Sequence, residues 1–242
     1  MDKDGVPELG ASGVWLAVGH RRFLLTAAHA IDDGFRWFPQ QQGFRKLPDF
    51  VFLSTAPQGN RNLDNIDVAI VPLGAVEIAA MHPKHQFVTL AEVAVNLDHH
   101  LGDRYEFTGF PYRGATVIHW RRLITQRYVS ITDRIATLRE YQVRGYSPLA
   151  HVLIRYIRRK MLRDGIQITG PEPHGMSGGG IWKIDLLTGD RKLAGIATEN
   201  PSQYLVGTRI ALFLEPLRTI DPTISTLIPK PTDLGVAVAR IP

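Results

Sequence analysis

One serine stands among four glycines in the stretch His174-Gly-Met-Ser-Gly-Gly-Gly180. Two interpretations are open: the stretch is a flexible turn, or Ser177 is a nucleophile on a bend so tight that only glycine can flank it. A serine hydroxyl becomes a strong nucleophile only when a histidine takes its proton, and that histidine is usually oriented by a carboxylate. The second interpretation therefore requires a histidine and an acid elsewhere in the chain.

The order of the histidines excludes one class of serine hydrolase. The stretch 175–179 fits the Gly-x-Ser-x-Gly elbow of α/β-hydrolases, in which the catalytic histidine follows the serine. Every histidine of this chain precedes Ser177, namely His20, His29, His82, His85, His99, His100, His119, His151 and His174. The α/β-hydrolase interpretation is therefore excluded, and an order in which the histidine comes first remains.

His29 and Asp67 are the candidates for that order. His29 lies in LLTAAHAI, directly after a predicted strand, and Asp67 directly precedes the apolar segment 68–73. A carboxylate at the mouth of such a strand can be buried against an imidazole. Asp64 is the alternative acid, although it lacks the Asp-Val-Ala-Ile context of Asp67.

The elements that must position these residues are mostly short strands. Apolar or β-branched runs separated by turn residues recur along the chain and predict a β-barrel or sandwich. Only 209–220 has helical periodicity, and Pro216 is expected to kink that helix. The predicted strands are 12–18, 21–27, 50–53, 68–73, 104–111, 151–157, 180–184, 192–198 and 204–210, and the run 115–132 is consistent with two paired strands.

Three motifs in this order resemble the trypsin/chymotrypsin-fold serine peptidases. That family carries Thr-Ala-Ala-His, Asp-[Leu/Ile/Val]-Ala-[Leu/Ile/Val] and Gly-x-Ser-Gly-Gly. The chain has TAAH ending at His29, DVAI beginning at Asp67 and GMSGG around Ser177. The resemblance extends over roughly residues 10–220, and the absence of cysteine is similar to the bacterial members.

The resemblance implies an all-β fold of two antiparallel β-barrels, the trypsin-like double barrel, with a C-terminal helix. It implies one peptidase domain over 1–225, with subdomains of about 1–110 and 111–225. The remaining residues, 226–242, are expected to form a C-terminal extension or linker.

The resemblance also assigns roles to individual residues. His29 would be the general base, Asp67 the residue that orients it, and Ser177 the nucleophile. The backbone N–H groups of Gly175 and Ser177 would form the oxyanion hole, where such donors stabilise developing negative charge. His174, beside that loop, either touches substrate or is merely exposed.

By the same resemblance, the primary substrate pocket is lined by Pro171 and Glu172 on one side and by Thr198, Glu199 and Asn200 on the other. The two glutamates would favour a basic side chain in the substrate, because a carboxylate discriminates strongly for a charged partner. The alternative is that both glutamates point to solvent.

Two positions depart from the family's pattern. Zymogen-activated members carry aspartate where this chain has Met176, and many members carry proline where it has Gly180. Neither change removes a catalytic group. Because Met176 offers no charge to a new N-terminal amine, we expect activity without N-terminal cleavage. Any regulation would then come from substrate or partner binding, or from domains joined through 229–242.

Charge and composition narrow the choice of partners. Lysine and arginine total 28 against 23 acidic residues, for a net charge of +5. The basic clusters, 121–127 and 155–163, come without a nucleic-acid-binding motif or an aromatic stacking platform. We therefore expect a solvated basic face and no nucleic acid, with an acidic partner as the alternative.

Other features argue against metals, cofactors and membranes. The chain has no cysteine, which excludes disulfides and thiolate metal sites. His82-Pro-Lys-His85 and His99-His100 could be metal ligands, but no clustered acids accompany them, so we expect no metal and no cofactor. No apolar run approaches the roughly 20 residues that span a bilayer. The N-terminus lacks the pattern of a secretory signal, and a cytoplasmic location is expected.

The sequence therefore predicts a serine endopeptidase that cleaves a protein or peptide substrate through a Ser-His-Asp triad and an acyl-enzyme intermediate. The alternative is a catalytically silent pseudo-peptidase that binds peptides or partners through the same fold. An intact triad argues against the alternative.

Overall fold

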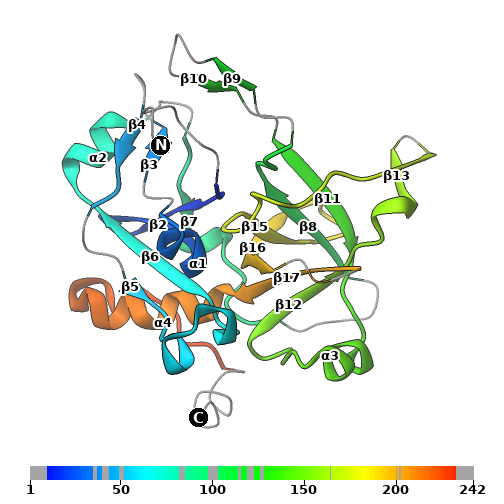
Figure 1. The fold of residues 1–242 in the computed structure, drawn as a ribbon. Coiled ribbons are helices and arrows are strands. Elements are labelled where there is room, and N and C mark those ends of the chain that lie inside the picture. Colours follow the sequence, from blue (N-terminus) through cyan, green and yellow to red (C-terminus); the bar gives the residue numbers. More distant parts are fainter. Residues whose placement is uncertain are drawn as a thin grey trace.

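The computed structural model describes residues 10–34, 37–39, 44–48, 52–81, 85–97, 103–113, 116–118, 123–125, 128–163, 165–199, 201 and 203–232. Within them the chain is mostly β, and two sheets lie side by side (Figure 1). Strands between residues 14 and 89 build one sheet, and strands between residues 104 and 209 build the other.

The first sheet has five strands in the order β5-β6-β2-β1-β7. Its long members are β1 (Val14–Val18), β2 (Arg21–Ala27) and β6 (Val68–Leu73), which pair antiparallel. The short strands β5 (Phe52–Leu53) and β7 (Val88–Thr89) form the edges, and β7 pairs with β1 in parallel. A separate hairpin joins β3 (Trp37–Pro39) and β4 (Phe44–Lys46).

The second sheet has six antiparallel strands in the order β11-β8-β15-β16-β17-β12. An isolated antiparallel bridge from Ile135 to Ile154 joins the two ends of this order, so the sheet curls on itself. Its strands are β8 (Arg104–Gly109), β11 (Val129–Arg134), β12 (His151–Arg155), β15 (Gly180–Ile184), β16 (Arg191–Glu199) and β17 (Tyr204–Arg209).

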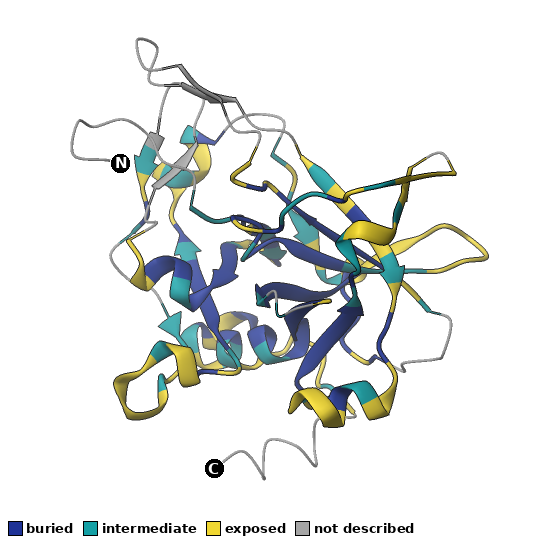
Figure 2. Cartoon of the chain, turned by 45° about the vertical axis from the view of Figure 1, so that its right-hand side comes forward, coloured by how far each residue is buried: buried dark blue, intermediate teal, exposed yellow. Residues whose placement is uncertain are grey.

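Apolar side chains explain why these strands form. Burial alternates along β1, as expected for a strand with one covered face, whereas β17 is buried along its whole length. The buried residues run through the middle of both sheets (Figure 2). One apolar cluster contains residues of the first sheet, of β16 and of helix α4 (Ile210–Ile220), so that helix and strand join the two halves.

The predicted double-barrel fold is confirmed, with the first sheet forming a half-barrel. The predicted strands 21–27, 68–73 and 180–184 have the bounds observed. In the run 115–132, β9 (Thr116–Ile118) and β10 (Leu123–Thr125) do pair, but β11 is a third strand that pairs with β8. A further hairpin joins β13 (Met161–Arg163) and β14 (Ile166–Ile168).

The prediction that only the C-terminal segment is helical was wrong. α3 (Leu138–Arg144) begins at Thr137, whose side chain accepts from Glu140 N while the Glu140 carboxylate accepts from Thr137 N. This capping box and the left-handed Gly145 at its end explain the helix. α1 (Ala28–Asp32) and α2 (Ala75–Ala80) are also short, and 3₁₀ turns cover 57–59, 61–63, 90–92, 158–160 and 222–224.

The C-terminal helix α4 is continuous through Pro216. Beyond it, Ile228 is buried and Thr232 N donates to Asn96 Oδ1 at 2.9 Å. Among the described residues, no helix is long and apolar enough to cross a membrane.

Candidate active site

His29 and Asp67 are brought together by the pairing of β2 with β6. Ala27 is opposite Val68 in that register, so the residues just beyond these two positions are neighbours. Asp67 Oδ2 lies 2.6 Å from His29 Nδ1, and Asp67 Oδ1 accepts from His29 N at 2.8 Å. The carboxylate therefore holds both the ring and the backbone of His29. It fixes Nδ1 as the protonated nitrogen and leaves Nε2 able to accept a proton.

The Asp67 backbone is in an unusual conformation. Its φ is +49°, in the left-handed region that non-glycine residues rarely occupy. The three consecutive carbonyls leading to it each accept a hydrogen bond. His151 Nε2 binds Asn65 O at 2.7 Å, Thr208 Oγ1 binds Ile66 O, and Ala28 N binds Asp67 O at 3.0 Å. These bonds hold Asp67 in place despite its strain.

The other candidate acid, Asp64, has different partners. Its Oδ2 pairs with Arg61 Nη1 at 2.5 Å and with Ser54 Oγ, and its Oδ1 accepts from Ile66 N at 3.0 Å. Asp64 therefore organises the loop before β6, and the structure places Asp67 at His29.

The electrostatic surroundings of His29 favour its protonated form. Its side chain is 33% exposed, and partial burial alone would lower the pKa. The hydrogen bond and charge of Asp67 outweigh that cost, with smaller help from Asp33 and Glu199, and the pKa is raised above 6.5. This makes His29 a stronger base than an isolated histidine.

Ser177 lies in the nucleophile loop, residues 171–179, between β14 and β15. The loop turns at Gly175, φ +88°, and at Gly178, φ +86°. A Cβ on Gly178 would come within 2.2 Å of Thr26 Oγ1 and 2.0 Å of Ser12 O, both in the first half of the chain. Glycine is therefore required where the nucleophile loop packs against the segment that leads to His29.

Gly175 N–H and Ser177 N–H, on either side of Met176, donate no hydrogen bond among the described residues. The N–H groups of Glu172 and His174 in the same described loop likewise donate none. Met176 N–H donates to Pro173 O at 2.9 Å. Free donors beside a serine hydroxyl are the arrangement that an oxyanion hole requires.

The carbonyl groups of the two peptide units that contain Gly175 N–H and Ser177 N–H accept hydrogen bonds. In the first unit His174 O accepts from Tyr112 N at 2.7 Å, and in the second Met176 O accepts from Gly179 N at 2.9 Å. A trans peptide directs its N–H away from its carbonyl, and no cis peptide occurs in the described ranges. These bonds therefore fix the direction of both free N–H groups.

The Ser177 hydroxyl is not bonded to His29. Its Oγ donates to Thr198 O over 3.5 Å, the long end of the hydrogen-bond range. Glu199, the residue after Thr198, acts on His29 through its charge, so β16 lies near both groups. Catalytic hydrogen bonds are often long in free enzymes and tighten when substrate binds.

The predicted substrate-contacting residues each have partners within the chain where the structure describes them. Thr198 is buried, and the Glu199 carboxylate accepts from Tyr146 OH at 2.7 Å. Pro171 O accepts from Tyr156 OH. Glu172 is 42% exposed and pairs with Arg113 at 3.1 Å, so its charge is already partnered. Asn200 lies outside the described residues.

His174 is exposed, and its ring lies 5.9 Å from that of Tyr112, edge to face. No group of three or more His, Asp or Glu side chains within the described ranges could hold a metal ion. His82, His99 and His100 lie outside those ranges.

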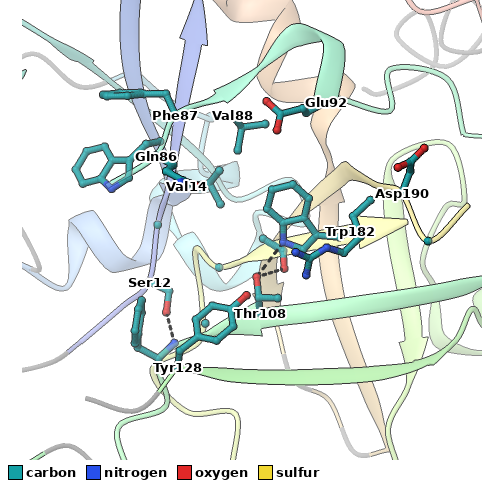
Figure 3. A pocket seen from close by; sticks show the side chains of 18 residues that line it. Ser12, Val14, Gln86, Phe87, Val88, Glu92, Thr108, Tyr128, Trp182 and Asp190 are labelled. Atoms are coloured by element: carbon teal, nitrogen blue, oxygen red, sulfur yellow. Dashed lines mark hydrogen bonds between the residues drawn. The ribbon is translucent and has the colours of Figure 1, made fainter. Parts of the chain in front are cut away.

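A pocket of about 560 Å³ borders the end of the nucleophile loop and is lined by 12–15, 86–88, 92, 108–110, 128, 179–180, 182 and 189–191 (Figure 3). His29, Asp67 and Ser177 are not among its lining residues. The pocket is therefore assigned no catalytic role, because none of these three residues lines it.

Sequence reasoning missed the residues that support the site. Ser12, Tyr112, His151 and Thr208 each bind backbone of a segment far away in sequence. No local pattern marks them, since serine, tyrosine, histidine and threonine occur throughout the chain and their partners emerge only on folding.

No protein-family model and no curated protein matches the chain. Among solved structures, it is similar to that of neuropsin, described as a serine protease expressed in the limbic system of mouse brain. The two share 16% sequence identity with a TM-score of 0.52, over 87% of this chain and 89% of the neuropsin chain. At this identity the likeness concerns the fold. The chain therefore has the fold of the trypsin-like serine proteases.

Proposed function

We propose that the chain is a serine endopeptidase of the trypsin-like type. The observation that carries the proposal is the pair of hydrogen bonds from His29 to Asp67, 2.6 Å and 2.8 Å, beside a serine loop with two free N–H groups. Base, orienting acid, nucleophile and oxyanion donors would each have a residue suited to the role. The fold shared with a serine protease supports the same proposal.

The proposed reaction has two steps. Ser177 Oγ attacks the scissile carbonyl carbon while His29 Nε2 takes the hydroxyl proton. The N–H groups of Gly175 and Ser177 stabilise the resulting oxyanion. His29 then protonates the leaving amine as the C–N bond breaks, which leaves an acyl group on Ser177. Water, deprotonated by His29, attacks that ester, and Ser177 Oγ regains its proton as the acid product leaves.

One observation favours the alternative of a silent pseudo-peptidase. The Ser177 hydroxyl is bonded to Thr198 O and not to His29. A pseudo-peptidase would bind peptides through the same surface and would leave Ser177 unreactive.

Labelling by a fluorophosphonate probe tests the two candidates. We expect the wild-type protein to be labelled and Ser177→Ala to be silent. Loss of a triad serine costs about 10⁶ in turnover in the best-studied example, subtilisin. Ser130→Ala, which alters an exposed serine on β11, is the control and should keep full labelling. A wild-type protein that binds peptides but takes up no probe would establish the pseudo-peptidase instead.

A further inference from the structure

Ser12 lies just before β1 and contacts the nucleophile loop with both its backbone and its side chain. Its N–H donates to Ser177 O at 2.7 Å, and its hydroxyl donates to Gly175 O at 3.0 Å. The residue is only 8% exposed, and it is separated from Gly175 by 163 positions in the sequence. A residue from the first half of the chain thus holds the loop that carries the proposed nucleophile.

The Ser12 side chain is itself fixed in place. Its hydroxyl oxygen accepts from Phe110 N at 2.9 Å, as Figure 3 shows at the edge of the pocket. Its carbonyl accepts from Thr26 Oγ1 at 2.8 Å. With Phe110 as the donor to its oxygen, the Ser12 hydroxyl hydrogen is free to point at Gly175 O. Both hydrogen-bonding functions of the hydroxyl are therefore used.

Four consecutive carbonyls of the nucleophile loop, those of residues 174–177, accept hydrogen bonds. Backbone N–H groups bind three of them, and a substitution would leave those donors in place. The carbonyl of Gly175 is held by a side chain, that of Ser12. It belongs to the peptide unit that joins Gly175 N–H to Ser177 N–H, so its orientation acts on both of them together with the bonds to His174 O and Met176 O.

Glycine makes this contact important. Gly175 has no Cβ to limit its backbone, and its φ of +88° is one of several conformations open to glycine. In the 175–176 peptide unit, Met176 N–H donates to Pro173 O within the same loop at 2.9 Å, and the Gly175 carbonyl is bonded to Ser12. Without Ser12, the Met176 bond alone would hold this unit, and a tilt of the unit would disturb the alignment of Gly175 N–H with Ser177 N–H.

We infer that Ser12 is a positioning residue whose hydroxyl, through Gly175 O, keeps the two oxyanion-hole N–H groups convergent. The inference rests on the proposed endopeptidase function. Ser12 touches no substrate in this role, so its loss should weaken stabilisation of the transition state and leave ground-state binding nearly unchanged.

The test is Ser12→Ala, with Tyr141→Phe as the matched control. The Tyr141 hydroxyl is also buried, accepts from Leu153 N at 2.7 Å and donates to His151 O at 3.3 Å. Both substitutions remove one donated and one accepted bond to backbone. Both of these partners lie on β12 and not in the nucleophile loop, so the control measures the effect of losing two buried backbone bonds elsewhere.

Removing one oxyanion-hole donor lowers kcat by about 10²- to 10³-fold. Ser12 orients the donors and is not itself a donor to the oxyanion, so its loss should have a smaller effect. We expect Ser12→Ala to lower kcat about tenfold. KM should stay within about twofold, since ground-state contacts are unchanged. Fluorophosphonate labelling and the affinity for phenylboronic acid, which forms a tetrahedral adduct on serine, should fall by the same factor as kcat. The pH midpoint of activity should not move, because Ser12 does not contact His29.

A Ser12→Ala protein whose kcat, labelling rate and boronate affinity match those of Tyr141→Phe would overturn the inference while the proposed function stands. A change in KM alone would do the same. A wild-type protein that is never labelled would overturn both. If Ser12→Ala does not fold, Ser12→Cys keeps the shape with a weaker donor. It should then show an intermediate kcat, and wild-type kcat would count against the inference.

Discussion

The protonation state of His29 links the site to pH. A general base must be neutral, and the Asp67 carboxylate raises the pKa of His29 above 6.5. We therefore expect kcat/KM to rise with pH and to reach half its plateau above pH 6.5. The measurement is a pH profile from about 5 to about 9 on a peptide substrate. A midpoint below the ordinary histidine value would contradict the described His29–Asp67 pair.

Replacing the acid tests the same pair from the other side. Asp67→Asn keeps the shape but loses the charge and favours the wrong tautomer of His29, so kcat should fall by about 10⁴. The pH midpoint should also move down, because the main cause of the raised pKa is gone. Asp64→Asn is the control, since Asp64 bonds to Arg61 and not to His29. It should lower thermal stability and leave the pH midpoint in place.

Substrate preference distinguishes the two glutamates of the predicted substrate pocket, Glu172 and Glu199. Glu199 lies near enough to act on His29 through its charge, whereas Glu172 pairs with Arg113 on the surface. We expect Arg or Lys before the cleaved bond, and Glu199→Gln should reduce that preference about tenfold. Glu172→Gln should change it little. The measurement is a cleavage-site profile on a peptide library, and one without basic enrichment in the wild type would dispose of the idea.

Among the elements, β12 and β17 support the segment that carries Asp67. His151 on β12 is buried and binds Asn65 O through Nε2. Burial lowers its pKa, against the opposing effect of its bonds to Asn65 and Ser147. The folded protein therefore keeps His151 neutral at pH values where the unfolded chain takes up a proton. Its contribution to stability is present above pH 6.5 and is lost as the pH falls below that value.

A His151→Gln variant tests this sign, because glutamine keeps an N–H donor and does not titrate. The wild-type unfolding free energy should fall faster than the variant's as the pH is lowered from about 7 to about 5, by at most about 1.4 kcal/mol per pH unit. Urea unfolding at several pH values measures the difference. His29 titrates in the opposite sense in both proteins and cancels in the comparison. Equal slopes of unfolding free energy against pH would show that His151 takes up its proton as readily in the folded state as in the unfolded chain.

Elements differed in how far the sequence could predict them. The strands from Arg21, Val68 and Gly180 were predicted with the observed bounds because each consists mostly of apolar residues over five to seven positions. α2 and α3 were missed because six or seven residues are too few to show a helical period. The Thr137-x-x-Glu140 spacing was the available signal for α3.

The site was predictable only in part. The motifs around His29, Asp67 and Ser177 are local, so they could be found by reading along the chain. Their supports are not: Ser12 meets Gly175 across 163 positions, and Thr208 meets Ile66 across 142. The left-handed φ of Asp67 was also not predictable, because aspartate adopts that conformation more often than most residues but still only in a minority of cases.

At the scale of the whole molecule, Met176 bears on how the protein becomes active. Its side chain is fully buried in the apolar cluster of the second sheet. An aspartate there would be buried without a partner, so Met176→Asp should cost about 3 kcal/mol or more in unfolding free energy. Met176→Leu should cost less than about 1.5 kcal/mol. Urea unfolding of both variants measures this, and an equally stable Met176→Asp would reveal a cation near that position.

The same residue predicts that activity needs no N-terminal cleavage. With no carboxylate at position 176, a new amine would lack the partner that an aspartate there provides. Fluorophosphonate labelling of a chain with a blocking N-terminal tag should equal that of the untagged chain. A tagged protein that stays silent until the tag is cut would contradict this interpretation of Met176.

The long separation between Ser12 and the nucleophile loop also matters while the chain is being made. A ribosome that has released the first 150 residues has delivered His29, Asp67 and Ser12, but neither Ser177 nor the strands β15 to β17. Contacts across such distances form late, because the loop between them must close first. Under the proposed function, the newly made protein therefore carries a base and an acid without a nucleophile until Ser177 has been made. Up to that point it could cleave neither its own unfolded segments nor those of neighbouring nascent chains.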